Sequence, residues 1–278
     1  MIKRVSSTGY LTSITSKLMS TRESYDPEFF LKLAQVEDEH FWFRTRNQVI
    51  STLAKQITAK WQAGYHVLEV GCGTGNVLRA LEKVCAGGLI VGMDLFAQGL
   101  EFARKRTRCP LVQGDLERPG LGVPFDMIGA FDVIEHLPDD RRILQCICSM
   151  LKPGGVLLLT VPAHQSLWSY FDEASHHCRR YEPEGLRHRL TECGFEVEYL
   201  SEFMASIYPL VWAVRRLRLL KPRLFKPNSA NDLALEELKI VPIANGLLTF
   251  LLEQEAKLIE SRRVLPFGTS LVAAARRT

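Results

Sequence analysis

Residues 67–75 read Val-Leu-Glu-Val-Gly-Cys-Gly-Thr-Gly, the most informative segment of the sequence. Its first part is apolar, which is typical of a buried strand, and its glycines directly precede a predicted helix over Asn76–Val84. A strand that ends in Gly-x-Gly-x-Gly at the start of a helix lets a ligand approach the backbone closely. The dinucleotide fingerprint Gly-x-Gly-x-x-Gly would need a glycine at position 76, where this chain has asparagine. The spacing therefore argues against a dinucleotide site.

Carboxylates stand near the ends of three predicted strands in this region. Glu69 lies two residues before Gly71, where it would repel a pyrophosphate but suits a cationic ligand that carries amino and sulfonium groups. Asp94 lies 23 residues after Gly71 and can accept two hydrogen bonds from ribose hydroxyls. Asp115, after a third short strand, can accept a hydrogen bond from an adenine amino group. Together they indicate a pocket for a positively charged nucleoside.

Composition limits the class of protein. The 278 residues are 46% hydrophobic and 24% charged, as is ordinary for a globular protein that buries a core. The net charge of +4 is too small to indicate nucleic acid by itself. The 7 cysteines form no C-x-x-C pair, which argues against a structural zinc site or a disulfide framework and favours reduced thiols in the cytoplasm. No apolar run reaches the roughly 18 residues of a membrane-spanning helix.

Strands and helices alternate along the middle of the chain, which predicts an α/β fold with a parallel sheet. The predicted strands are His66–Val70, Leu89–Met93, Leu111–Gln113, Phe125–Phe131, Val156–Val161, Phe195–Leu200 and a closing Thr269–Ala275. The predicted helices between them are Asn76–Val84, Ala97–Thr107, Asp139–Leu151 and Glu182–Cys193, with a turn at residues 152–155.

The remaining segments flank or interrupt this core, which comprises residues 65–203 and 267–278. Residues 1–25 are rich in serine and threonine and are predicted to be a flexible tail, with an organelle-targeting peptide as the alternative. Residues 26–64 are predicted to form a helical lid whose second helix runs from Arg44 to Trp61. Residues 204–266 are predicted to be a helical insertion, with a helix over Asn231–Arg263 broken near Pro242.

Within this insertion, residues 204–227 hold six basic side chains and no acidic one, beside Trp212 and several aliphatic residues. That composition suits a helix lying in a membrane interface and predicts peripheral membrane contact. The alternative is a cap helix with one buried and one solvated face.

The motifs resemble those of the class I S-adenosylmethionine-dependent methyltransferases, in the ubiquinone and menaquinone methyltransferase-like group. The pieces that match are Val67-Leu-Glu-Val-Gly-Cys-Gly-Thr-Gly75, Val91-Gly-Met-Asp94, Gly114-Asp-Leu116, Phe125-Asp126 with Asp132-Val-Ile-Glu-His-Leu137, and Leu151-Lys-Pro-Gly-Gly155. The resemblance implies a Rossmann-like three-layer sandwich around a seven-stranded, mostly parallel sheet whose last strand is antiparallel. It also implies that S-adenosylmethionine is the cofactor, bound by Glu69, Gly71, Cys72, Gly73, Gly75, Asp94, Leu95, Asp115, Leu116 and Phe131.

Two segments carry candidate catalytic residues. Asp132, Glu135 and His136 resemble the segment that holds a divalent ion in ubiquinone-biosynthesis O-methyltransferases, and the alternative for them is helix capping and packing. The segment 172–181 follows the fifth strand, and its imidazole, guanidinium and phenol groups suit an acidic or phosphorylated substrate. The alternative is a solvated loop with local ion pairs. The candidates are His136 and His177 for catalysis, and Arg180 and Tyr181 for substrate binding.

An aromatic cluster before the first core strand supplies two further substrate candidates, Trp42 and Arg46. In related methyltransferases the N-terminal helices cover the cofactor, and Arg46 could meet the carboxylate of the methyl donor. The alternative is that the aromatic side chains only pack the helix on the sheet.

The sequence therefore predicts in-line methyl transfer from S-adenosylmethionine to a small-molecule or lipid-linked acceptor. One alternative is a nucleic-acid methyltransferase, which is not favoured because Phe131-Asp-Val-Ile stands where base methylation has an Asn/Asp-Pro-Pro-Tyr/Phe signature. The other is a module that binds the cofactor without catalysis.

Overall fold

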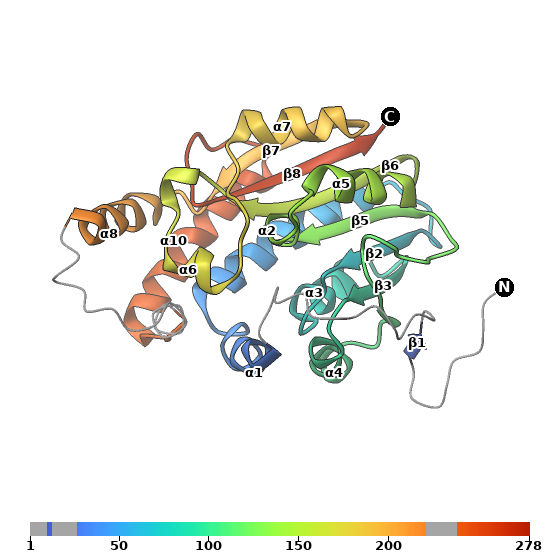
Figure 1. The fold of residues 1–278 in the computed structure, drawn as a ribbon, viewed down its shortest axis with the longest axis horizontal. Helices are drawn as coiled ribbons and strands as arrows, with labels where there is room; N and C mark the ends of the chain where they lie inside the picture. The colour runs from blue at the N-terminus through green and yellow to red at the C-terminus, as the bar shows by residue number, and fades with distance from the viewer. Residues whose placement is uncertain (1–9, 13–26, 221–237) are drawn as a thin grey trace.

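The computed structural model describes residues 10–12, 27–220 and 238–278, and one mixed sheet runs through this part of the chain (Figure 1). Its strand order is β1-β4-β3-β2-β5-β6-β8-β7. All neighbours are parallel except β8, which is antiparallel to both β6 and β7. The strands are β1 (Tyr10–Thr12), β2 (His66–Val70), β3 (Leu89–Asp94), β4 (Leu111–Gln113), β5 (Phe125–Phe131), β6 (Leu151–Pro162), β7 (Phe195–Phe203) and β8 (Ser270–Arg277).

Helices cover both faces of this sheet. The α-helices are α1 (Pro27–Val36), α2 (Phe41–Thr58), α3 (Asn76–Val84), α4 (Ala97–Arg106), α5 (Asp140–Met150), α6 (Tyr170–Ala174), α7 (Pro183–Glu192), α8 (Tyr208–Leu220) and α10 (Pro242–Glu260). Two short 3₁₀ helices are η1 (Ile134–His136) and η2 (Gln165–Leu167).

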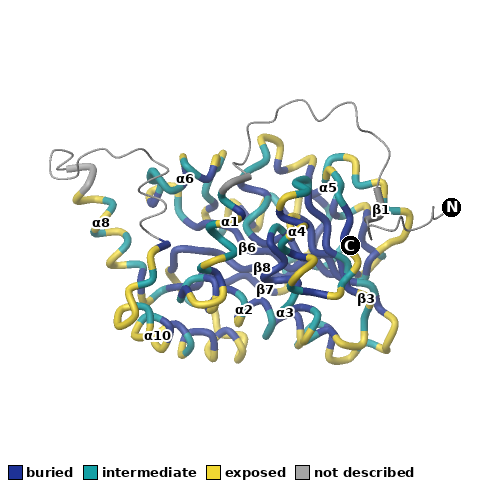
Figure 2. The backbone as a smooth tube through the Cα atoms, turned by 90° about the horizontal axis from the view of Figure 1, so that it is seen from below, coloured by how far each residue is buried: buried dark blue, intermediate teal, exposed yellow. Residues whose placement is uncertain are grey.

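The central strands are buried on both faces, because their side chains alternate between two hydrophobic clusters. In β2, Val67 joins a cluster with residues of α2, α3, α4 and α10, whereas Leu68 joins a cluster with residues of α5 and α7. Figure 2 shows the buried sheet between helices whose outer sides are exposed. The predicted three-layer sandwich, with the strands β2 to β8 in a mostly parallel sheet and an antiparallel last strand, is confirmed.

The N-terminal part departs from the sequence prediction in two places. Within the predicted tail 1–25, Tyr10–Thr12 form β1 beside β4, and the rest of the tail lies outside the described residues. Helix α2 begins at Phe41 rather than Arg44, because the side chain of His40 caps it by accepting a hydrogen bond from the Trp42 backbone nitrogen at 3.3 Å. The aromatic cluster is therefore the first turn of α2.

The chain between β7 and β8 holds α8 and α10. Residues 221–237, which include parts of the predicted segment 204–227 and helix 231–263, lie outside the described residues. Helix α10 packs along α2, and its Asn245 side chain accepts a hydrogen bond from the Phe41 backbone nitrogen at 2.8 Å. In the described part of the chain, no helix combines the length and the apolar character needed to cross a bilayer.

Candidate active site

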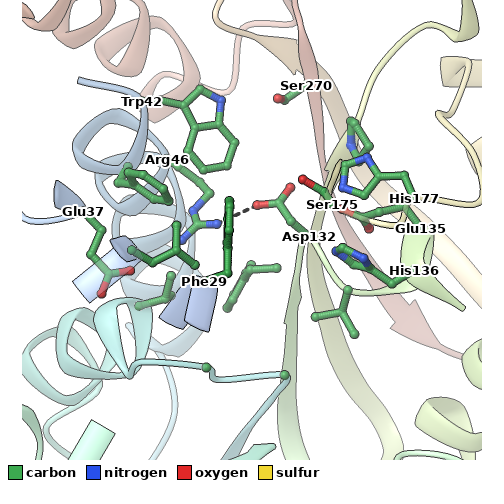
Figure 3. Close-up of a pocket in the computed structure, with 18 of the residues that line it drawn as sticks. Phe29, Glu37, Trp42, Arg46, Asp132, Glu135, His136, Ser175, His177 and Ser270 are labelled. Atoms are coloured by element: carbon green, nitrogen blue, oxygen red, sulfur yellow. Dashed lines mark hydrogen bonds and ion pairs between the residues drawn. The ribbon is translucent and has the colours of Figure 1, made fainter. Parts of the chain in front are cut away.

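One cavity of about 780 Å³ lies at the carboxyl ends of β2, β3 and β5, which is the edge where parallel α/β sheets bind ligands. Its walls come from the loops that follow these strands, from α1 and α2, from the segment 175–180, and from α8. Figure 3 shows that Trp42 and Arg46 stand on one side of the cavity and that His136 and His177 stand opposite them. The site therefore joins parts of the chain that are far apart in sequence.

The loop after β2 has a backbone that only glycine accommodates without strain. Gly71 has a φ of +65°, and a Cβ atom there would lie 2.6 Å from the Cγ2 atom of Val133. The Gly73 backbone nitrogen in turn donates a 2.7 Å hydrogen bond to Asp94 Oδ2. This places bare backbone between the carboxyl groups of Glu69 and Asp94.

Asp94 ends β3 and is 6% exposed, with both carboxyl oxygens facing backbone donors. Its Oδ1 accepts from the Phe96 nitrogen at 2.8 Å, and Oδ2 accepts from Gly73. Burial raises the pKa of Asp94 to about 6, although these hydrogen bonds act in the opposite direction. Each oxygen keeps a lone pair, so the ionised form can accept hydrogen bonds from a vicinal diol such as a ribose.

Glu69 gives a direct test of whether the cavity fits the expected cofactor. It is 2% exposed, and its Oε2 atom has no hydrogen-bond partner. Burial raises the pKa of Glu69 well above its usual value, and only Arg46 opposes this shift. A buried carboxyl group without a partner is costly, and the ammonium group of an amino-acid ligand would satisfy it. These hydrogen-bond acceptors thus fit the amino and ribose ends of S-adenosylmethionine.

The other predicted cofactor residues divide into two groups. Glu69 and Asp94 line the cavity with seven other predicted residues. These are Gly71, Cys72, Gly73, Leu95, Asp115, Leu116 and Phe131. Gly75 is not among the residues that line the cavity. Its φ is +77°, and a Cβ atom there would lie 2.8 Å from the Ala103 Cα atom of α4. A side chain at Gly75 would therefore disturb the close packing of α3 on α4.

The pKa of Asp94 predicts the pH dependence of cofactor binding. Because the ionised carboxylate is the acceptor form, affinity for S-adenosylhomocysteine should be full above pH 7 and fall as the pH drops through about 6. Well below pH 6, the affinity should fall by about tenfold per pH unit. Isothermal titration between pH 8 and pH 5 measures this, and Asp94→Asn should show a smaller change, since only Glu69 then titrates at this end. An affinity that stays constant down to pH 5 would refute the ribose assignment.

Helices α1 and α2 are fixed over the cofactor end. Glu37, directly after α1, is buried and accepts hydrogen bonds from the Thr74 hydroxyl and from Arg106. The Phe30 ring of α1 lies 5.9 Å from the Phe96 ring. Sequence reasoning missed Glu37, because nothing in the sequence shows that it meets Arg106 across the loop.

Arg46 is buried and links α2 to the end of β5. Its Nη1 atom lies 2.7 Å from Asp132 Oδ2, as the dashed line in Figure 3 marks. The guanidinium carbon stands 4.8 Å from the centre of the Trp42 ring. Trp42 and Arg46 therefore both line the cavity, and Asp132 is engaged by Arg46.

The two histidines predicted for catalysis lie against each other. The rings of His136, on η1, and His177, after α6, meet edge to face with centroids 4.7 Å apart. Burial, and then the neighbouring His177, lower the pKa of His136 to about 3, so its ring is neutral at physiological pH. The two residues come from segments 41 positions apart in sequence, and the structure brings them to one wall of the cavity.

Asp172 orients His177, and sequence reasoning had given it no role of its own. Its fully buried carboxylate lies 2.9 Å from His177 Nδ1 and 2.7 Å from Arg180 Nε. Burial alone would raise the pKa of Asp172, but the hydrogen bond from His177 and the charge of Arg180 outweigh it and lower the pKa. Because the ionised carboxylate can only accept, Nδ1 of His177 carries a proton, and in the neutral imidazole the lone pair is then on Nε2.

The structure places the two substrate candidates of the segment 172–181, Arg180 and Tyr181, in different surroundings. Tyr181 does not line the cavity, because it packs in the core and donates a 2.9 Å hydrogen bond to Asp140. Arg180 does line the cavity, but its guanidinium is held by Asp172 and by the Ala163 carbonyl oxygen at 3.0 Å. Its position favours support of the His177–Asp172 pair over capture of an anionic substrate.

The candidate metal ligands also differ from the sequence motif. Atoms of Glu135, His136 and His177 lie within 4.8 Å of one another, whereas Asp132 belongs to the ion pair with Arg46. Glu135 is fully buried, and neither of its carboxyl oxygens has a hydrogen-bond partner. Burial, and then nearby Asp132, raise its pKa well above the usual value. The structure therefore replaces Asp132 by His177 in this set.

On the α8 side, the residues that line the cavity are apolar apart from Arg215, and the sequence motifs did not predict them. Ile207, Leu210, Val211 and Val214, from α8 and the turn before it, line it together with Leu238. Ser270, at the start of β8, adds a hydroxyl at the top of the view in Figure 3, between Trp42 and His177. The only available signal was the position of this segment before the last strand, which does not determine which side chains turn inward.

Comparison with known proteins agrees with this geometry. The family model described as "Methyltransferase domain" matches residues 40–200. A "probable S-adenosylmethionine-dependent methyltransferase" of Mycolicibacterium smegmatis is 31% identical over 165 residues, which is 58% of this chain and 62% of that protein. A ubiquinone biosynthesis O-methyltransferase of Coxiella burnetii is 29% identical over 114 residues, which is 39% of this chain and 47% of that protein. The match thus spans about half to two thirds of these relatives.

A solved structure supports the fold. Phosphoethanolamine N-methyltransferase 2 of Haemonchus contortus, in complex with S-adenosyl-L-methionine, superposes with a TM-score of 0.56 at 20% identity. The match covers 92% of this chain and 58% of that one. The chain therefore belongs to the methyltransferase domain family.

Proposed function

We propose that the chain transfers the methyl group of S-adenosylmethionine to a small or lipid-linked acceptor with a hydroxyl group and an apolar body. The observation that carries this proposal is the His177–Asp172 pair at the cavity wall, since a base is useful for a hydroxyl acceptor and dispensable for a neutral amine. The apolar wall from α8 supports an apolar body for the acceptor. The ubiquinone-related relative is named for O-methylation, which agrees with this choice.

The residues of the chain have separate roles in this reaction. S-adenosylmethionine supplies an activated methyl group, so the protein mainly aligns the two reactants and excludes water. Glu69 and Asp94 fix one end of the cavity, and α1 and α2 close it from solvent. Nε2 of His177 takes the proton of the acceptor hydroxyl, and ionised Asp172 stabilises the imidazolium through Nδ1. His136 stays neutral and packs the His177 ring in place.

The test is a methyl-transfer screen with radiolabelled S-adenosylmethionine against simple catechols, phenols, prenylated phenols and amines. We expect transfer to hydroxyl acceptors, with a higher kcat/KM for hydroxyl acceptors that carry an apolar substituent. Transfer to amines alone would overturn the acceptor class. Transfer only to added nucleic acid would support a nucleic-acid methyltransferase, and cofactor binding without transfer to any acceptor would support a non-catalytic module.

A divalent metal ion at Glu135, His136 and His177 is a second candidate, favoured by the unpartnered buried carboxyl group of Glu135. Asp172 would then act as the carboxylate that orients a metal-bound histidine. Such an ion would polarise an acceptor hydroxyl and take the place of His177 as base.

Titration of chelator-treated protein with Mn²⁺ distinguishes a metal ligand from a general base at His177. The metal proposal expects one tight site, a loss of about tenfold or more in affinity in His177→Ala, and no change in the surface variant His188→Ala. Full methyl transfer in the presence of excess chelator, together with no Mn²⁺ binding, would rule out the metal site and support His177 as the base.

A further inference from the structure

Exposed large apolar side chains are concentrated at one end of the described chain. Twelve of the fifteen lie between Leu210 and Phe267, and the three others are Leu31, Leu89 and Val123. Figures 1 and 2 both place α8 and α10 at the same end of the molecule. Soluble monomers rarely leave so much apolar surface in one region without a partner.

Helix α10 carries two apolar rows, and only one of them is packed. The inner row, which faces the core, contains Leu252, Ala256 and Ile259 and is buried. The outer row repeats at helical spacing and is exposed; it consists of Ile243 (88% exposed), Leu247 (59%), Phe250 (60%) and Leu258 (37%). A helix that is apolar on both sides normally has both sides covered, so the outer row indicates a missing partner.

Helix α8 adds positive charge to this end. Its sequence holds Arg215, Arg216 and Arg218 and no acidic residue. Trp212 and Leu217 are 44% and 50% exposed, and the Arg216 guanidinium carbon lies 5.7 Å from the centre of the Trp212 ring. An exposed tryptophan beside arginine is typical of side chains that sit at the boundary between lipid and water.

The combination of charge and apolar surface selects among possible partners. A second copy of the chain in a two-fold dimer would bring the same arginine-rich helices together, which like charges oppose. Nucleic acid would satisfy the arginines, but its interfaces are polar and would leave the α10 row unused. An anionic bilayer accommodates both the arginines and the apolar side chains. The arginines meet the headgroups, while tryptophan and aliphatic side chains enter the layer beneath.

We propose that the α8–α10 face, formed by Trp212, Arg216 and Leu217 with Ile243, Leu247 and Phe250, docks on an anionic lipid bilayer. The cavity reaches this face, since Leu210 lines it and is 61% exposed. Docking would therefore place the apolar end of the cavity at the membrane, where a lipid-linked acceptor resides. This route for the acceptor rests on the proposed function, whereas the docking itself does not.

Co-sedimentation of the full chain with vesicles tests the proposal. The expected result is binding to phosphatidylcholine vesicles with about one third phosphatidylglycerol, at least about tenfold weaker binding to pure phosphatidylcholine, and weakening by salt. Ile243→Ser/Leu247→Ser/Phe250→Ser and Arg216→Gln/Arg218→Gln should each lower the partition coefficient about tenfold or more. The matched controls Leu89→Ser/Val123→Ser and Arg141→Gln/Arg142→Gln change exposed residues elsewhere and should bind like the wild type.

Three outcomes would overturn the proposal. The first is no binding of the wild type to anionic vesicles at low salt, or equal binding by the face variants and their controls. The second is a wild-type dimer that the serine variant converts to a monomer, which would assign the face to a second copy. The third is duplex DNA binding that the glutamine variant loses while vesicle binding is absent. Titration of every variant with S-adenosylhomocysteine confirms folding and keeps this test separate from the cofactor site.

Discussion

Asp94→Ala is expected to weaken binding of S-adenosylhomocysteine by about 10- to 150-fold, which corresponds to roughly 1.5–3 kcal/mol for lost hydrogen bonds to a charged group. The reason is that Asp94 is the buried carboxylate at the end of β3 and is placed to accept from both ribose hydroxyls. Isothermal titration at pH 8, where the wild-type carboxylate is ionised, measures the effect directly.

The control for this prediction separates ligand contact from loop geometry. Asp94 also holds the backbone nitrogens of Gly73 and Phe96, so its loss could disturb the loop itself. Asp94→Asn keeps an oxygen for one of these donors and should fold like the wild type in thermal melting while still binding weakly. Glu101→Ala, which removes an exposed carboxylate from α4, should leave affinity unchanged. Wild-type affinity in Asp94→Ala would contradict the ribose assignment.

His177→Gln is expected to lower kcat for a hydroxyl acceptor by about 100- to 10,000-fold, the usual contribution of a general base. Glutamine removes the proton-accepting Nε2 atom but fills a similar volume beside His136. Asp172→Asn should reduce kcat by a smaller factor and change the pH–rate profile, because the amide no longer stabilises the imidazolium. Steady-state kinetics with the acceptor found in the screen measures both.

Cofactor affinity distinguishes this role from a structural one. His177 lies on the wall opposite α2, so His177→Gln should bind S-adenosylhomocysteine within about twofold of the wild type. His188→Gln, an exposed histidine on α7, should keep full kcat. If His177→Gln retained wild-type kcat, or lost cofactor affinity and kcat together, the assignment of His177 as the base would be wrong.

The strands and helices around the glycine loop were predictable from sequence alone. The bounds predicted for β2, α3, β4 and β5 are those found, because short apolar runs end at glycine or aspartate where the chain leaves the sheet. The prediction was wrong where a distant partner decides the outcome. Residues 152–155 look like a turn but extend β6, since Leu151 pairs with Phe125 of β5 across a β-bulge.

In the candidate site, too, residues with a local sequence signal were predictable and residues that depend on distant contacts were not. Glu69 and Asp94 were identifiable because each has a fixed spacing from the glycine loop. Tyr181 was assigned to the substrate because it follows Arg180 in a polar segment, but its hydroxyl meets Asp140, 41 residues away, in the core. Gly75 was assigned to the cofactor, although close packing against Ala103 explains its conformation. Such contacts arise only when α3, α4, α5 and the segment 175–181 are placed in space.

A crystal structure of the chain with S-adenosylhomocysteine would show whether Glu69 and Asp94 define the two ends of the cofactor site. We expect the amino group of the ligand near Glu69, the ribose hydroxyls within hydrogen-bond distance of Asp94, and the backbone of residues 71–74 between them. Ligand density elsewhere in the cavity, with neither carboxyl group in contact, would contradict this expectation.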